Sequence, residues 1–144
     1  MNTPLIVLIS QLFSTFAMFG LIWLIQLVHY PTFKFIDKSD FRSFTVFHTQ
    51  MITYIVGPLM LTEAIGALYL VLNDTNTLTN FNFMLVILIW ISTAILSVPL
   101  HNKLYGKRDL EVVHKLIKTN WPRTIMWSAK SVLIAYYFYK NTTF

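Results

Sequence analysis

Long apolar stretches separated by polar connections dominate the chain. Four of them fit membrane spans, at about residues 4–29, 52–72, 83–100 and 124–139. A transmembrane helix needs about 20 mainly apolar residues, so the third and fourth stretches are short and suit a tilted helix or a thin bilayer. The pattern predicts an all-α integral membrane protein whose four transmembrane helices form a bundle.

Two of the connections, residues 29–50 and 101–123, have a helical periodicity of their own. Phenylalanines recur every third residue from Phe41 to Phe47, and apolar residues recur at helical steps through residues 108–118. Such spacing is typical of a helix with one apolar face. We therefore predict two short amphipathic helices that lie on the cytoplasmic membrane surface.

The composition agrees with a bilayer location. Hydrophobic residues make up 56% of the chain and charged residues 12%, about half of the ~25% charged residues of an average soluble domain. The 144 residues are enough for one domain, which we assign to residues 1–144. The chain contains no cysteine, which excludes disulfides, thiolate metal sites and cysteine nucleophiles.

The net charge of +5 points to membrane orientation rather than to nucleic acid as a partner. Residues 29–50 contain three basic and two acidic residues, residues 101–123 contain six and two, and residues 73–82 contain one acid and no base. The positive-inside rule makes the two basic connections cytoplasmic and places both termini outside. The aromatic residues suited to the interface belt are Tyr30, Trp121 and Trp127.

The histidines all fall in or beside the two basic connections, at His29, His48, His101 and His114. Neutral imidazole is a common metal ligand, so the first three are candidates to ligate a haem iron or a non-haem metal. The alternative is a set of interfacial histidines that bond headgroups, water or helix ends. No spacing matches a metal motif such as HExxH, and the cofactor stays open.

Polar side chains recur at helical steps within the spans. The stripes are Gln11, Ser14, Met18, Ile22, Gln26 and His29 in span one, Trp90, Thr93, Ser97 and His101 in span three, and Asn120, Arg123, Trp127 and Lys130 in span four. Small and polar residues often mark helix contacts in membranes. The stripes predict a polar cavity at the cytoplasmic end of the bundle.

Glu63 lies deep in the second span, ~16 Å from its start at 1.5 Å per residue. A lone charge there costs several kcal/mol, so Glu63 should be neutral or paired, and Lys130 is the obvious partner. The functional interpretation is a proton carrier or general base. The structural interpretation is an ion pair, or hydrogen bonds to threonine and tyrosine.

The segment Asn120 to Arg123 precedes the fourth span. A helix start and an arginine fork both favour anions, so Asn120, Trp121 and Arg123 are candidates for substrate or anion binding. The alternative is an ordinary helix start, with Asn120 as its cap, Pro122 in its first turn and Arg123 at the headgroups.

Four short motifs, VHYPTF, FRSFTVFH, VPLHNKL and NWPRTIMW, resemble those of the anthrone oxygenase-like family of small four-span membrane proteins. The resemblance covers the layout of nearly the whole chain, although His101 stands where the family turn usually has Asn. It implies an oxygenase that acts on an aromatic polyketide without a conventional cofactor. The residues it points to are His29, His101, Asn102, Trp121 and Arg123. A closer similarity to uncharacterised bacterial proteins implies the bacterial inner (plasma) membrane.

The combined prediction is a redox or oxygenase-like membrane protein that binds a hydrophobic, aromatic ligand or a haem or metal in the polar cavity. The predicted roles are cofactor or metal binding for His29, His48 and His101, catalysis for Glu63 and Arg123, and substrate contact for Asn102, Asn120, Trp121 and Trp127. The alternative is a non-enzymatic accessory or assembly subunit of a larger membrane complex. A homo-oligomer stays open.

Overall fold

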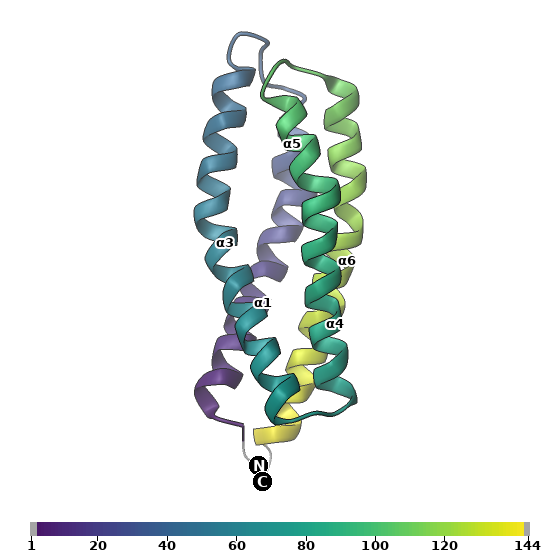
Figure 1. Cartoon of the computed structure of the whole chain (residues 1–144). Coiled ribbons are helices and arrows are strands. Elements are labelled where there is room, and N and C mark those ends of the chain that lie inside the picture. Colours follow the sequence, from purple (N-terminus) through teal and green to yellow (C-terminus); the bar gives the residue numbers. More distant parts are fainter. Residues whose placement is uncertain (1–2, 143–144) are drawn as a thin grey trace.

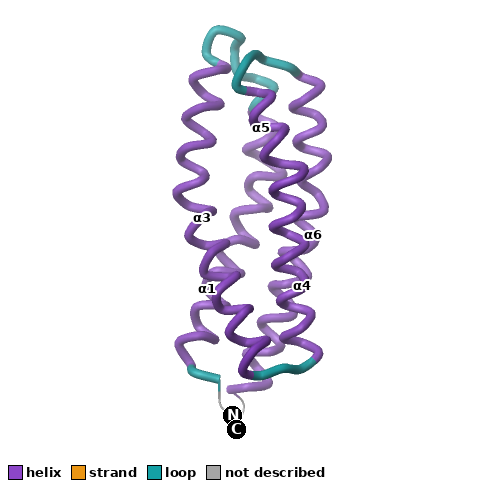
Figure 2. The backbone as a smooth tube through the Cα atoms, in the orientation of Figure 1, coloured by secondary structure: helices purple, strands orange, loops and turns teal. Residues whose placement is uncertain are grey.

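The computed structural model of the chain describes residues 3–142, and all of their regular structure is helical. The elements are α1 (Leu5–Leu24), η1 (Ile25–His29), α2 (Tyr30–Thr32), α3 (Phe41–Asn73), α4 (Thr77–Ser92), η2 (Thr93–Ser97), α5 (Val98–Leu104) and α6 (Leu110–Thr142), where η marks a π-helical turn. Figure 2 shows the connections confined to the two ends of the molecule. The predicted all-α class is confirmed.

Four rods of helix lie side by side (Figure 1). α1 packs against α3 and α6, and α4 packs against the same two helices, so the rods close into a ring. The connections 33–40 and 105–109 lie at one end of the bundle, which we call the loop end. Residues 74–76 lie at the opposite end, the terminal end, where α1 begins and α6 finishes.

Three rods are long and apolar enough to cross a membrane: Leu5–Thr32, Phe41–Asn73 and Thr77–Leu104. This is consistent with a membrane protein. α6 is 33 residues long, like α3, but it is not apolar enough by composition to count among these candidate spans. Its buried face is polar at several positions, including Asn120, Arg123 and Lys130.

The prediction of two short surface helices is wrong. α3 begins at Phe41 and runs unbroken into the second span, and α6 begins at Leu110 and runs through Pro122 into the fourth. Residues 41–56 contain neither glycine nor proline, so nothing forces a break in α3. α6 continues through Pro122 although a proline removes one hydrogen bond of the helix. Each 33-residue helix is ~50 Å long, which exceeds the ~30 Å hydrocarbon core of a bilayer.

Each π-helical turn ends two residues before a proline: η1 before Pro31 and η2 before Pro99. A π turn holds one more residue than an α turn, so it shifts which residues face the core. The shift corrects the stripe predicted for span three. Trp90 is 45% exposed, and its neighbour Ile89 takes the core position at 1% exposure.

The loop end is tied together by apolar packing and one long-range hydrogen bond. Phe33 of the first connection, Phe41 of α3 and Leu116 of α6 are buried in one cluster. Arg108 Nη2 donates to the Lys34 carbonyl at 2.5 Å, which joins the two connections.

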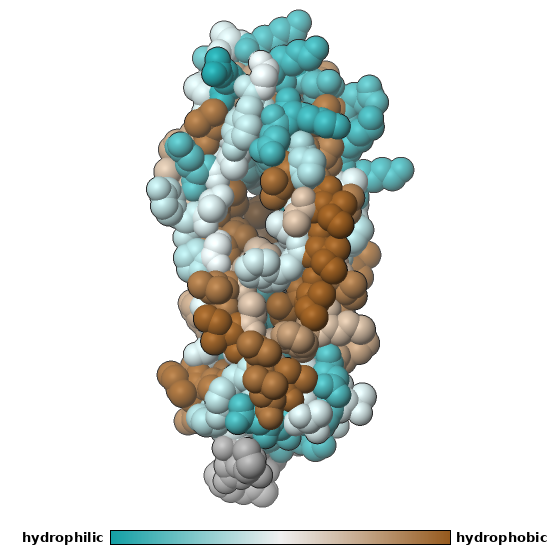
Figure 3. Space-filling view, viewed as in Figure 1, coloured by the Kyte–Doolittle hydropathy of each residue, from teal (hydrophilic) through white to brown (hydrophobic). Residues whose placement is uncertain are grey.

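The surface changes character along the bundle. Figure 3 shows hydrophilic residues crowded at the loop end and hydrophobic residues over much of the middle of the face in view. Large exposed apolar residues, such as Phe13, Ile65 and Val132, lie on different rods. An outer surface of this kind suits contact with lipid.

Candidate functional site

Three rods bring His29, His48 and His101 together near the loop end. His29 Nε2 and His48 Nδ1 lie 2.6 Å apart and share a hydrogen bond. The rings of His48 and His101 have centroids 5.3 Å apart. We call these three residues the histidine cluster; His114 is exposed on α6 and lies outside it.

Tyr30 and Arg123 extend the cluster toward the interior. The Tyr30 hydroxyl is 3.1 Å from His101 Nε2 and lies near the Arg123 guanidinium. Arg123 Nη1 donates to Ser97 Oγ at 2.6 Å, and its guanidinium lies 5.5 Å from the centroid of the Trp127 ring. The arginine therefore sits among neutral partners, with its charge held over an aromatic face.

An apolar groove of about 350 Å³ runs between α1 and α3 and reaches the histidine cluster. Its lining residues are Leu21, Leu24, Ile25, Val28, His29, Phe44, Phe47, His48, Met51, Ile52 and Ile55. All of them except the two histidines are apolar, and all belong to helices that can cross a membrane. The groove can therefore hold an apolar molecule with one end at His29 and His48.

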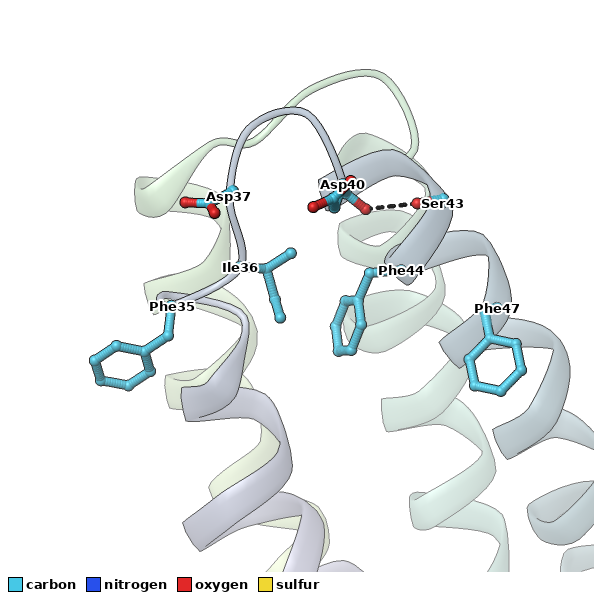
Figure 4. A pocket seen from close by; sticks show the side chains of 7 residues that line it. All are labelled: Phe35, Ile36, Asp37, Asp40, Ser43, Phe44 and Phe47. Carbon is cyan, nitrogen blue, oxygen red and sulfur yellow. Dashed lines mark hydrogen bonds between the residues drawn. The ribbon is translucent and has the colours of Figure 1, made fainter.

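A second pocket, of about 500 Å³, lies at the loop end beside the groove. In Figure 4, Ile36 and Phe44 project into the space between the connection and α3, and Phe35 points away from it. Ser43 Oγ donates to the Asp40 carbonyl at 2.8 Å on its rim. Phe44 and Phe47 line both pockets, so the two spaces are neighbours.

Glu63 lies apart from the histidine cluster in a bonded group of its own. Its Oε1 is 2.8 Å from Lys130 Nζ, and Trp127 Nε1 donates to its Oε2 at 3.0 Å. Lys130 Nζ also donates to Thr15 Oγ1 at 2.7 Å. The predicted pairing of Glu63 with Lys130 is confirmed, and the carboxylate has both oxygens occupied.

Side-chain amides join the rods above and below the ion pair. Gln11 Nε2 donates to the Glu63 carbonyl at 2.9 Å, and Asn82 Nδ2 donates to Gln11 Oε1 at 3.4 Å. Asn120 Nδ2 donates to Gln26 Oε1 at 2.8 Å. Asn120 thus bonds across the bundle in the middle of α6, and the interpretation of it as a helix cap is wrong.

Two of the predicted substrate contacts, Asn102 and Trp121, are exposed on the outside of the bundle. Asn102 is exposed on α5, because it follows the inward His101 and one helical step turns the chain by ~100°. Trp121 is 41% exposed for the same reason, as it follows the buried Asn120, and it packs edge-on against Trp23 with ring centroids 5.9 Å apart.

Tyr30 and Trp127 are buried, so their prediction as interface residues is wrong. Both rings have a polar atom with a hydrogen-bond partner on another rod, which lets an amphipathic aromatic residue leave the interface. The burial of Trp127 could have been predicted from its spacing, because it lies on the same stripe as Asn120, Arg123 and Lys130. Tyr30 carried no such signal, because η1 shifts the register just before it.

Within residues 3–142, no group of three or more histidine, cysteine, aspartate or glutamate residues is arranged to hold a metal ion. The hydrogen bond between His29 and His48 occupies one nitrogen of each ring. Each ring keeps its second nitrogen, and ligation of a metal or haem by the three histidines stays a prediction.

Comparisons with protein-family models, with curated proteins and with solved structures find no significant match. The resemblance to anthrone oxygenase-like proteins stays a prediction from the four motifs. The function is therefore argued from the site.

Proposed function

We propose that this chain is a four-span membrane protein that binds a hydrophobic, aromatic ligand beside its histidine cluster and acts on it in an oxygenase-like reaction. The groove between α1 and α3 carries the proposal, because it is apolar along its length and reaches His29 and His48. The two features together suit a ligand whose body is apolar and whose reactive group is polar.

The outer face of α6 supports a fourth membrane crossing. From 121 to 139 its exposed residues are Trp121, Pro122, Ile125, Ala129, Val132, Tyr136 and Tyr139, none of them charged. The charged residues of this stretch, Arg123 and Lys130, are buried in the bundle. The mean hydropathy of α6 includes these two buried residues, so it underestimates how apolar the outer face of the helix is. These 19 residues span ~28 Å, close to the hydrocarbon thickness.

The charge distribution supports an orientation. The connections that contain Lys34, Lys38, Lys107 and Arg108 both lie at the loop end. By the positive-inside rule the loop end is cytoplasmic, and the terminal end faces outward. The histidine cluster and the groove then lie in the cytoplasmic half of the membrane.

The reaction would use the histidines as acid and base. His29 lines the groove and shares a hydrogen bond with His48, so a proton taken from a ligand can pass between the two rings. Loss of a proton from a ring methylene group would make the ligand more reactive toward molecular oxygen, the oxidant. The methylene would become a carbonyl that keeps one oxygen atom, and the other oxygen atom would leave as water with the two hydrogens. Flat aromatic rings also suit a groove that contains Phe44 and Phe47.

The test is binding of methyl anthracene-9-carboxylate, a neutral fluorescent aromatic, to the purified protein in phosphatidylcholine nanodiscs. Ile55→Trp fills the groove, and Ile65→Trp is its matched control, because Ile65 is exposed on the same helix and does not line the groove. We expect saturable binding to the wild type and to Ile65→Trp, and binding weakened by about tenfold or more in Ile55→Trp.

Equal binding by all three proteins, or no saturable binding at all, would contradict the ligand-binding proposal. An absorption spectrum and metal analysis of the same sample test the cofactor prediction, since a Soret band or stoichiometric metal would assign the histidines to ligation. A stable protein partner that co-purifies with a chain that binds no ligand would favour the accessory-subunit alternative.

A further inference from the structure

Arg123 is a buried cation that no carboxylate of the described chain compensates. Its side chain is 5% exposed. The acidic residues are Asp37 and Asp40 in the first connection, Glu63 beside Lys130, Asp74 beside Tyr137, Asp109 in the second connection and Glu111 in the first turn of α6. The ion pairs within residues 3–142 are Glu63–Lys130 and Glu111–Lys115, and neither includes Arg123.

An arginine keeps its charge in a protein, so Arg123 cannot relieve its burial by losing a proton. Burial of an unpaired charge costs several kcal/mol. Ser97 supplies a hydrogen bond and the Trp127 ring supplies a cation–π contact, but neither of them is an anion. The charge that would balance Arg123 must come from outside the described chain.

Buried nitrogen atoms without hydrogen-bond partners, on Arg123 and two neighbouring histidines, also indicate a missing acceptor. Arg123 Nε, His48 Nε2 and His101 Nδ1 are buried and have no hydrogen-bond partner. Arg123 Nε always carries a hydrogen and is a donor. If the Tyr30 hydroxyl donates to His101 Nε2, the ring hydrogen of a neutral His101 is on Nδ1, and Nδ1 is then also a donor. His48 is itself 4% exposed, so its free nitrogen is well shielded from solvent.

We propose that the ligand of the groove is a hydrophobic carboxylic acid whose carboxylate compensates Arg123. The inference rests on the proposed function, because it places the apolar body of the acid in the groove. His48 joins the two parts of the site: its Nδ1 is bonded to His29 at the groove, and its ring lies against that of His101. A guanidinium is the side chain best shaped to bind a carboxylate.

The experiment compares anthracene-9-carboxylate with its methyl ester, which has the same ring system and no charge. Both are titrated into the protein in phosphatidylcholine nanodiscs, with binding corrected for partition into empty nanodiscs. We expect the wild type to bind the acid about tenfold or more tightly than the ester, since burial of a charge beside its partner is strongly favourable only when both are present. Arg123→Gln should abolish the preference, and Arg123→Lys should keep part of it.

The possible results separate the two proposals. Equal affinity for acid and ester in the wild type, with both lost in Ile55→Trp, would overturn the carboxylate inference and leave the groove as a ligand site. An acid affinity that falls as chloride replaces gluconate would assign the charge on Arg123 to an inorganic anion and overturn the ligand class. If Arg123→Gln fails to fold, Arg123→Lys decides, because an unchanged preference with a repositioned charge contradicts the role of the guanidinium.

Discussion

At the residue scale, the ion pair between Glu63 and Lys130 is a salt bridge whose two side chains are both buried. Glu63→Gln would leave the Lys130 ammonium buried without its counter-charge. We expect this change to destabilise the fold by about 3–5 kcal/mol, because the desolvation penalty of the remaining charge is no longer offset. Thermal unfolding in detergent measures the loss.

The exposed pair Glu111–Lys115 is a matched control, since its nitrogen–oxygen distance of 2.7 Å is nearly the same and both side chains face solvent. Glu111→Gln should change the melting temperature little, because exposed ion pairs are screened. The double variant Glu63→Gln with Lys130→Met should recover much of the loss. A single Glu63→Gln as stable as the wild type would contradict the importance of the pair.

Gly66 is a second residue whose substitution should change the stability of the protein. A β-carbon at this position would overlap the side-chain amide of Gln11, which bonds the Glu63 carbonyl. Gly66→Ala should therefore destabilise the protein by about 1–3 kcal/mol through overpacking, measured as a lower melting temperature.

Gly57 provides the comparison in the same helix. A β-carbon there meets no atom within 4 Å, and alanine is the better helix former. Gly57→Ala should leave the protein as stable as before or more so. A larger loss in Gly57→Ala than in Gly66→Ala would show that α1 and α3 are not packed as described.

The residues of the interior were predictable where charge made them costly. Glu63 and Lys130 could be paired from the sequence because neither can stand alone in a bilayer. His29, His48 and His101 could be placed at one end because the basic connections there mark a common side. Aromatic residues were not predictable in this way, since tyrosine and tryptophan are stable both at an interface and in a bonded interior.

At the element scale, the π-helical turns set the faces of the first and third rods. Hydrophobic periodicity assumes a constant angular step, so a single extra residue in a turn moves the predicted stripe by one position. This is why Trp90 was predicted at the core where Ile89 lies. Proline alone is not a sufficient signal, because Pro58 and Pro122 lie inside unbroken α-helices.

Pro99 tests what the turn η2 contributes. Pro99→Ala restores a backbone donor and should raise the melting temperature by a few degrees, because proline inside a helix costs a hydrogen bond. If the widened turn closes, His101 rotates away from Tyr30, and we expect binding of the anthracene probes to weaken about tenfold, as each residue turns a helix by ~100°.

Pro122→Ala is the control, because that proline is exposed on the outer face of a helix without a π turn. It should leave probe binding unchanged. Unaltered probe binding in Pro99→Ala would mean that η2 is not needed to position His101.

At the scale of the whole molecule, the orientation can be tested directly because the chain has no native cysteine. Ser39→Cys places a thiol in the exposed connection at the loop end, and Asn80→Cys places one near the terminal end on α4. A membrane-impermeant maleimide should label Asn80→Cys in intact cells and Ser39→Cys only after the membrane is opened. The reverse pattern would invert the proposed orientation and place the groove in the outer half of the membrane.

The helical bundle as a whole was the most predictable level, since long apolar stretches and short connections leave few other folds. The lengths of α3 and α6 were not predictable to the same degree. The amphipathic patterns at 39–48 and 108–118 are equally compatible with separate surface helices and with extensions of the spans. The difference lies in whether the backbone breaks after each pattern, and no proline or glycine signal decides it at residues 48–52.

The inward polar face of α6 also constrains how the protein can be made. A helix that contains Arg123 and Lys130 partitions poorly into lipid by itself, yet it is the last of the four to be synthesised. Until α6 is synthesised, Glu63 in the second rod lacks its partner Lys130. If α6 crosses the membrane as proposed, biogenesis favours holding the earlier helices near the insertion machinery until α6 arrives, so that Glu63 and Lys130 enter lipid as a neutral pair. In the proposed arrangement, a ribosome-bound chain that ends before residue 110 would expose the unpaired Glu63 to the bilayer.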